Sequence, residues 1–283
     1  MNLTAATRLA GVVGNPISHS LSPILHNAWL EAAGLDGAYL AFGLAPGRFR
    51  AFVDGLRGGT LAGINVTLPF KTEALAAADR VSARAHAAGA ANVLVFGPDG
   101  SVSADNTDGE GLLYAFDRQA PGFRPDSGPL VLYGAGGAAR GAVAAFLEAG
   151  CPEVRLLNRT RARAEDLAAR FGDRVRALNT TDPDALSGAA ALVNASSAGL
   201  GPDAPPPPDF SGAPTTAVAM DMTYRPLRTP FLKAAAARGL RTVDGLDMLI
   251  GQAIPAFTAF FGQPPPAAAD VRGRVLRLLG EAP

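Results

Sequence analysis

Residues 130–139 read LVLYGAGGAA and carry the strongest structural signal in the chain. Four apolar residues without polar alternation predict a parallel strand that is buried on both faces. The glycines that follow predict a tight turn, and the alanine-rich stretch to Glu148 predicts an amphipathic helix. A strand, a glycine turn and a helix in this order are typical of a dinucleotide-binding unit, in which the pyrophosphate lies against the helix N-terminus.

Each small residue of this turn has a physical use in such a unit. One glycine makes the tight turn, a second lets the pyrophosphate approach the backbone, and Ala139 permits close packing of helix and strand. A glycine turn alone is weak evidence, because ordinary loops also contain glycines. Its position between a strand and a helix favours the cofactor interpretation, and we predict cofactor contacts from Gly134, Ala135, Gly136, Gly137 and Ala138.

The next strand, residues 154–157, ends in Asn158-Arg159-Thr160, and this ending indicates which dinucleotide binds. An NAD site normally places Asp or Glu here to hold the ribose 2′-hydroxyl. Arg159 and Arg163 would instead attract a 2′-phosphate, with Asn158 and Thr160 beside them. Two charge-assisted bonds of about 1.5–3 kcal/mol each would give a preference on the order of a hundredfold. We therefore predict NADP, although strand-end arginines are often merely solvated.

Composition excludes several other classes of protein. Lys+Arg and Asp+Glu balance at 25 each, so no net field favours DNA, RNA or an anionic membrane. One cysteine and three histidines predict no metal cluster, and the single Cys151 fits a reducing cytoplasm. No secretory signal is expected in residues 1–7, and no apolar run reaches the roughly 18 residues of a spanning helix.

Short apolar runs alternate with helical patterns along the 283 residues, which predicts an α/β protein with enough chain for two cores. We predict strands at 9–13, 38–42, 62–67, 130–133, 154–157, 175–178, 191–194 and 218–222, and a hairpin of 92–96 with 101–104. We predict helices at 22–30 (capped by Ser22), 49–56, 72–87, 109–119, 137–148, from about 161 and 182, and at 246–261 and 267–279. Residues 201–214 are expected to form an irregular surface loop.

This order predicts two domains. The first is an α/β substrate domain with a mostly parallel sheet, formed by residues 1–107 plus 244–283, whose C-terminal helices return to its core. The second is an inserted, doubly wound Rossmann-type domain, residues 108–243, that binds NADP. The cleft between the two domains is the expected active site.

Polar residues in the first domain stand where parallel strands end. Ser18 and Ser20 follow the first strand and can converge on a small anion such as a carboxylate, although a plain capping loop is the alternative. Asn65, Thr67 and Lys71 follow the third strand, at the edge where ligands bind in open sheets.

Asp108, His19 and His26 are polar residues that could take part in catalysis, but each has a structural alternative. An N-cap is the plain alternative for Asp108. His19 and His26 have no acidic neighbour in sequence to orient them, which favours structural roles.

Nine blocks of sequence, taken in order, resemble the shikimate dehydrogenase family over essentially the whole chain. They are GNPISHSLSP at 14–23, NVTLPFK at 65–71, GAAN at 89–92, DNTDG at 105–109, GAGGAAR at 134–140, NRT at 158–160, NASS at 194–197, DMTY at 221–224 and DGLDMLIGQA at 244–253. Two small departures are Val93 and Ser196, which stand where threonine is common in the family.

The resemblance implies a cytoplasmic oxidoreductase of aromatic amino-acid biosynthesis that reversibly reduces 3-dehydroshikimate to shikimate with NADPH. It assigns the substrate carboxylate to Ser18, Ser20 and Tyr224, with help from Thr67. It assigns the ring oxygens to Asn65, Lys71, Asn92, Asp108 and Gln252, and further cofactor contacts to Met222 and Gly245. No metal, nucleic acid or membrane is implied, and the oligomeric state is a monomer or a homodimer.

Lys71 and Asp108 are the catalytic pair in this interpretation. A cationic Lys71 would stabilise the alkoxide that forms at the C3 oxygen and could protonate it, while Asp108 would hold a ring hydroxyl and orient the lysine. Whether Lys71 donates the proton or mainly orients the substrate stays open. The alternatives are a quinate/shikimate dehydrogenase of broader substrate or cofactor use and a non-catalytic dinucleotide sensor.

Overall fold

The computed structural model describes residues 3–196 and 206–281, and the chain divides into two compact units. Unit 1 comprises Met1–Thr107 and Ile250–Pro283, and unit 2 comprises Asp108–Leu249. The first boundary coincides with the one expected from the sequence. The second falls inside helix α9 (Gly245–Phe261), a few residues later than expected.

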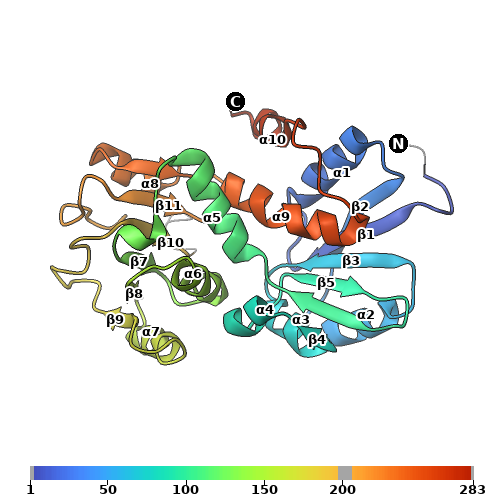
Figure 1. Cartoon of the computed structure of the whole chain (residues 1–283), viewed down its shortest axis with the longest axis horizontal. Helices are drawn as coiled ribbons and strands as arrows, with labels where there is room; N and C mark the ends of the chain where they lie inside the picture. Colours follow the sequence, from blue (N-terminus) through green and yellow to red (C-terminus); the bar gives the residue numbers. More distant parts are fainter. Residues whose placement is uncertain (1–2, 197–205, 282–283) are drawn as a thin grey trace. The chain divides into compact units, whose positions relative to one another are not determined.

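Unit 1 contains a six-stranded sheet in the order β2-β1-β3-β5-β6-β4, of which all strands except β6 are labelled in Figure 1. Its strands are β1 (Arg8–Gly14), β2 (Gly37–Gly43), β3 (Leu61–Val66), β4 (Arg80–Val81), β5 (Val93–Phe96) and β6 (Val102–Asp105). The pairs β1–β2, β1–β3 and β4–β6 are parallel, whereas β5 runs antiparallel to both of its neighbours. The predicted mostly parallel sheet with one hairpin is confirmed.

Helices of unit 1 are α1 (Ser22–Ala33), α2 (Phe49–Leu56), α3 (Lys71–Ala77), α4 (Ala83–Ala88), α10 (Val271–Leu279) and the C-terminal part of α9. Phe49 and Phe70 stack at 5.1 Å between ring centroids in a core that also contains Ile64. Full burial of each such side chain contributes about 1.5–3 kcal/mol, which fixes α2 and α3 against β3.

Unit 2 is a doubly wound domain with six parallel strands in the order β12-β11-β10-β7-β8-β9. Its strands are β7 (Leu130–Tyr133), β8 (Val154–Leu157), β9 (Val175–Leu178), β10 (Ala191–Asn194), β11 (Val218–Asp221) and β12 (Arg241–Val243). Its helices are α5 (Asp108–Gln119), α6 (Gly137–Glu148), α7 (Arg161–Ala168), α8 (Pro230–Ala237), the short 3-10 helix Pro125–Ser127 and the first residues of α9.

Alternate side chains of these strands enter two different cores. Leu130 and Leu132 pack in one cluster, while Val131 between them packs in the other. Because successive side chains of a strand point to opposite faces, a sheet covered on both faces requires continuous apolar runs. The prediction that residues 130–133 form a strand with apolar cores on both faces is therefore confirmed.

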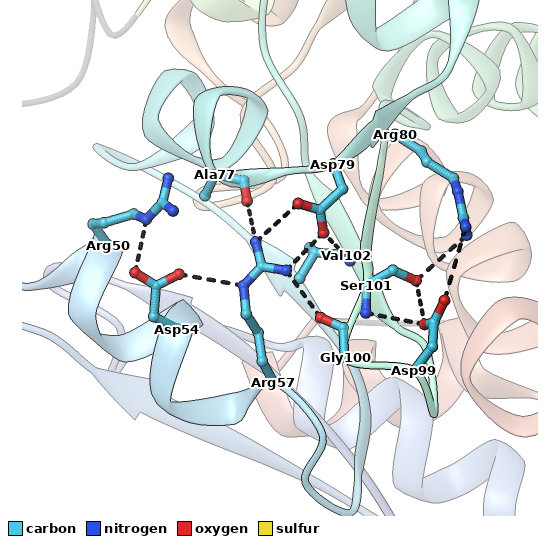
Figure 2. A network of polar contacts seen from close by, with 10 residues as sticks. All are labelled: Arg50, Asp54, Arg57, Ala77, Asp79, Arg80, Asp99, Gly100, Ser101 and Val102. Carbon is cyan, nitrogen blue, oxygen red and sulfur yellow. Dashed lines mark hydrogen bonds and ion pairs between the residues drawn. The ribbon is translucent and has the colours of Figure 1, made fainter.

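The predicted helix 72–87 is wrong, since α3 ends at Ala77 and α4 begins at Ala83. Between them β4 pairs with β6, and the Asp79 carboxylate accepts hydrogen bonds from Val102 N (2.7 Å) and the Arg57 guanidinium (2.6 Å). Figure 2 shows Arg57 also donating to the carbonyls of Ala77 and Gly100. These contacts between segments distant in sequence override the helix propensity of an alanine-rich stretch.

Three smaller expectations also differ from the structure. The helix expected from Asp182 is a series of turns, in which the Asp182 carboxylate accepts the N–H of Asp184 (3.0 Å) and competes with helical bonding. Helix α10 begins at Val271, capped by Asp270, rather than at 267. The cap of α1 is Leu21 without a side-chain bond, so Ser22 is the first helical residue.

Part of the expected loop 201–214 lies outside the described residues, as does Ser197; the described part, 206–214, contains no helix or strand. In the described residues, no helix is long and apolar enough to cross a membrane.

Candidate active site

The glycine turn of unit 2 follows β7 and opens α6 at the carboxyl edge of the sheet. Gly134 has a φ of 117°, and a Cβ there would lie 3.1 Å from the carbonyl oxygen of Ala195, so only glycine fits. A Cβ at Gly136 or Gly137 would meet no atom within 4 Å. The turn is therefore tight toward the protein and open on its other side, as a site for a close-lying pyrophosphate requires.

Helix α6 presents its N-terminus at this open side. Its N-cap is Gly136, which has no side chain to cap the first N–H groups. The first N–H groups of a helix have no partner within the helix and carry a partial positive charge. This donor set matches the chemistry of a pyrophosphate, with Ala135 and Ala138 adding only small side chains.

The predicted 2′-phosphate residues lie beside the turn, because Tyr133 and Leu157 are register partners and Gly134 N donates to Leu157 O (2.9 Å). Arg159 and Arg163 are exposed, and within the described part of the chain neither forms an ion pair. Arg161, between them, pairs with Glu165 at 2.7 Å and also donates to Asn179. Of these three arginines, the two that form no ion pair with a described carboxylate are the two predicted to meet a phosphate.

Asn158 and Thr160 shape the strand end that carries Arg159. Asn158 Nδ2 donates to the carbonyl of Thr160 (2.7 Å), which closes the turn before α7. Thr160 is the N-cap of α7, yet its side chain makes no capping bond. Its hydroxyl is therefore available as a further donor.

Met222 and Gly245 meet at the same edge of unit 2. A Cβ at Gly245 would lie 2.5 Å from the carbonyl oxygen of Met222, so the start of α9 packs directly on the backbone after β11. Tyr224, two residues further, is partly buried, and desolvation raises the pKa of its phenol. Any larger residue at position 245 would displace the segment that carries Met222 and Tyr224.

In unit 1, the ends of β1 and β3 are joined by backbone bonds. Thr67 N donates to Val13 O (3.0 Å) and Asn15 N donates to Leu68 O (3.0 Å). A Cβ at Gly14 would lie 2.5 Å from Thr67 Cγ2, so glycine is required for this approach. The structure therefore places Thr67 at the start of the loop that carries Ser18 and Ser20.

That loop leaves its polar groups accessible. Ser18 and His19 are exposed and Ser20 is partly exposed. Ser20 Oγ accepts a bond from Ser22 N at 3.3 Å, which anchors the loop to the first turn of α1. Ser20 therefore has a structural contact, and its hydroxyl hydrogen can still be donated to an anion.

Three predicted substrate residues form one hydrogen-bonded amide cluster. Asn92, which is 2% exposed, donates through Nδ2 to Gln252 Oε1 (3.3 Å) and to Thr107 Oγ1 (3.0 Å). Asn65 Nδ2 donates to the carbonyl of Asn92 (3.2 Å). Asn92 lies directly before β5, whereas Gln252 lies on α9, 160 positions further along the chain. Sequence spacing therefore gave no means of predicting this contact.

Tyr39 supports this cluster and was missed by the sequence reasoning. It is fully buried in β2, and its hydroxyl donates to Asn65 Oδ1 at 2.7 Å. Burial raises the pKa of Tyr39 well above its ordinary value, so the phenol keeps its proton. A lone hydroxyl-bearing aromatic in an apolar strand was the available signal, since a buried tyrosine O–H needs a partner.

Lys71 and Asp108 lie at the starts of two helices. Lys71 is the first residue of α3, partly exposed, and its carbonyl accepts a bond from Ala91 N (2.8 Å), next to Asn92. Asp108 is the first residue of α5 and is 8% exposed. It belongs to unit 2, whereas Lys71 belongs to unit 1.

The whole chain has extensive matches to known proteins. Residues 12–94 match a model described as shikimate dehydrogenase substrate binding domain, and residues 125–199 match one described as shikimate / quinate 5-dehydrogenase. Residues 245–272 match the shikimate 5′-dehydrogenase C-terminal domain. A Caulobacter vibrioides protein named shikimate dehydrogenase (NADP(+)) is 57% identical over 280 residues, covering 99% of this chain and 98% of that protein.

The chain belongs to the shikimate dehydrogenase family.

Solved structures of this family have the same fold. A shikimate dehydrogenase from Aquifex aeolicus superposes with a TM-score of 0.87 and 34% identity, covering 98% of this chain and all of the other. A shikimate 5-dehydrogenase from Thermus thermophilus, in complex with NADP(H) and shikimate, gives 0.83 and 38% identity, covering 93% and 97% of the two chains. The α/β fold with a Rossmann-type domain is thereby confirmed.

In this shikimate dehydrogenase family member, His26 lies in the apolar core of unit 1. His26 is fully buried, stacks on Tyr39 at 3.9 Å between ring centroids, and has no hydrogen bond from either ring nitrogen to any described group. Burial lowers its pKa to about 3, so it is neutral at physiological pH. The structural role expected for His26 is confirmed.

One cavity lies away from the candidate site, and the described residues contain no cluster of metal ligands. A cavity of about 460 Å³ borders Phe123, Arg124 and Arg241 at the opposite, amino edge of the unit 2 sheet, and none of the predicted residues lines it. Among the described residues, no group of three or more His, Cys, Asp or Glu could hold a metal ion.

Proposed function

We propose that this protein catalyses the reversible, NADP-dependent reduction of 3-dehydroshikimate to shikimate, a step of aromatic amino-acid biosynthesis. The amide cluster of Asn65, Asn92 and Gln252 is the observation that carries the proposal. Neutral amides at the carboxyl edge of a sheet suit the hydroxyls of a small polyol, and unit 2 of the same chain offers a dinucleotide turn. The names of the relatives support this assignment.

Ser18, Ser20 and Thr67 are proposed to bind the substrate carboxylate, together with Tyr224 from unit 2. Ser18 is exposed and Ser20 partly exposed, and the backbone bonds between the ends of β1 and β3 hold Thr67 at the start of their loop. These hydroxyls can donate hydrogen bonds to a carboxylate. A substrate without a carboxylate would lose those bonds and bind less well.

Lys71 and Asp108 are proposed as the catalytic pair. The cationic amine of Lys71 stabilises the negative charge that develops on the C3 oxygen during reduction and gives that oxygen its proton. Asp108 accepts a hydrogen bond from a ring hydroxyl and so holds the substrate ring in place. NADPH, when bound, supplies the hydride.

The cofactor is proposed to lie along the carboxyl edge of unit 2. Gly134, Ala135, Gly136, Gly137 and Ala138 would face the pyrophosphate; Asn158, Arg159, Thr160 and Arg163 the 2′-phosphate; and Met222 and Gly245 the nicotinamide end. The unpaired state of Arg159 and Arg163 in the described structure supports NADP over NAD. The cytoplasmic location and a monomeric or homodimeric state remain predictions.

The test is a spectrophotometric assay with shikimate and with quinate, each combined with NADP and with NAD. We expect rapid turnover of shikimate with NADP and a much lower kcat/KM for the other three combinations. Efficient use of quinate would instead favour a shikimate/quinate dehydrogenase. An absence of turnover with every pair, in protein shown to bind NADP, would favour a dinucleotide sensor.

A further inference from the structure

Asp221 is a buried carboxylate for which the proposed chemistry has no use. It is the last residue of β11 and is 1% exposed. It accepts hydrogen bonds from Asn194 Nδ2 (3.0 Å), the backbone N–H of Thr223 (2.9 Å) and Thr229 Oγ1 (2.7 Å). A carboxylate removed from water needs such donors, and three of them make its position strongly determined.

The direction of each bond is fixed by the partner's other contacts. Thr229 Oγ1 accepts the N–H of Leu232 (3.3 Å), which favours donation of its own hydrogen to Asp221. Asn194 Oδ1 accepts from Ser196 N (3.1 Å) and Ser196 Oγ (2.7 Å), so its Nδ2 must face Asp221. All three partners of the carboxylate are therefore donors, and an amide in its place would set a donor against one of them.

The carboxylate connects two segments that leave the sheet side by side. Asn194 ends β10 and is the register partner of Asp221, and Met222 N donates to Asn194 O at 3.0 Å. Beyond Asn194, the carbonyl of Ala195 lies against Gly134, the first residue of the cofactor turn. Beyond Asp221, the turn held at Thr223 continues directly into Tyr224.

We infer that Asp221 is a positioning residue for hydride transfer. It holds the segments after β10 and β11 in one geometry, which fixes Met222 for the cofactor and Tyr224 for the substrate carboxylate. Asp221 itself contacts neither, and the inference rests on the roles given to Met222 and Tyr224 in the proposed function. Its loss allows the two segments to shift, and small misplacements of reacting groups reduce rates strongly.

The test compares Asp221→Asn with Thr229→Val and Thr229→Ser, which remove and retain the threonine hydroxyl. Asp209→Asn is the matched control, because the exposed Asp209 also accepts a backbone bond from two residues ahead (Ser211 N, 2.8 Å). For each variant kcat, both KM values, Tm and the primary isotope effect with shikimate deuterated at C3 are measured.

Asp221→Asn is expected to lower kcat about tenfold or more, to raise the KM for shikimate several-fold, and to enlarge the isotope effect, because C–H cleavage becomes slower than product release. Thr229→Val shows the same changes more weakly, and Thr229→Ser and Asp209→Asn behave like the wild type. A purely structural role would lower the amount of active protein and leave the KM and the isotope effect unchanged.

Wild-type KM and isotope effect in both Asp221→Asn and Thr229→Val would overturn the inference. If Asp221→Asn does not fold, the comparison of Thr229→Val with Thr229→Ser decides. Tyr224→Phe separates the two levels of the argument. An unchanged KM for shikimate in that variant would count against the proposed function, whereas a raised KM beside a silent Asp221→Asn would count against the inference alone.

Discussion

The two candidate binding regions differ in how their polar groups are satisfied before a ligand arrives. In unit 1, Asn65 and Asn92 are buried and held by hydrogen bonds to one another and to Gln252. In unit 2, Arg159 and Arg163 are exposed and form no ion pair with any described residue. The amides are oriented in advance, whereas the arginines must be ordered by the ligand.

This difference suits the two ligands. A small polyol offers few contacts, so a site that needs little reorganisation loses little of the binding energy. A 2′-phosphate carries enough charge to order two flexible side chains, but that attraction is screened by salt. We therefore expect the KM for NADP to rise with ionic strength more than the KM for shikimate.

Lys71→Ala should have the largest effect on the substrate side. Removing a positioned acid is expected to lower kcat by about a hundredfold or more, while NADP binding, measured by fluorescence titration, stays near normal. Lys71→Arg keeps the charge and serves as the control for electrostatic stabilisation. Near-normal turnover in Lys71→Ala would remove this residue from the mechanism.

Arg159→Asp should have the next largest effect, on the cofactor side. Loss of one charge-assisted bond to phosphate, with repulsion added, is expected to raise the KM for NADP about tenfold to a hundredfold. The KM for shikimate should hardly change, and Arg161→Asp, whose arginine pairs with Glu165, is the matched control. Equal increases in both KM values would contradict a 2′-phosphate site.

Asn92→Ala should test whether the amide cluster is also part of the fold. The substitution leaves Thr107 N, which donates to Asn92 Oδ1 at 2.8 Å, without its partner. An unsatisfied buried group costs about 1–3 kcal/mol, so the free energy of unfolding in urea should fall by about that amount. Ser18→Ala, at an exposed position, should change it by less than about 0.5 kcal/mol.

His26→Phe should have the smallest effect, a change in how the free energy of unfolding depends on pH. The folded pKa of His26, about 3, lies below the unfolded value of 6.5, so the unfolded state binds the proton between these values. Stability is then complete above about pH 6.5 and is lost as the pH falls, by on the order of 1.4 kcal/mol per pH unit.

The measurement is urea unfolding at pH 7, 6 and 5, a range chosen to lie above most carboxyl titrations. The wild type should lose stability across it, and His26→Phe should show a flatter profile. Parallel profiles for the two proteins would mean that His26 gains a partner or solvent in the folded state.

Local patterns were sufficient to predict the strands and the glycine turn of the doubly wound unit, although not the turns that follow Asp182. The run LVLY is followed directly by the glycine turn, and Arg159 ends the next strand, so each was recognised from its own local pattern. The break at 78–82 was not predictable in this way, since it depends on Arg57 and on pairing with β6. Composition alone favours a helix there.

Strand-end positions indicated part of the substrate side, whereas Asn92, Tyr224 and Gln252 were assigned by resemblance alone. The Asn92–Gln252 contact joins residues separated by 160 positions, and no local rule relates them. Tyr39 and Asp221 were missed for a related reason: each acts through a partner on another strand, and the sequence shows neither partner.

The division of α9 has a consequence for the order in which the protein is made. Unit 2 is complete at Leu249, whereas unit 1 still requires Ile250–Pro283. Because the ribosome adds residues from the N-terminus, the unit that begins the chain is the last to be finished. Contacts such as Arg274 with Glu31, 243 positions apart, close only after synthesis of unit 2. We therefore expect that, in a newly made chain, unit 2 folds before the amide cluster of unit 1 forms. During synthesis, unit 2 should be the first part of the chain to become resistant to protease.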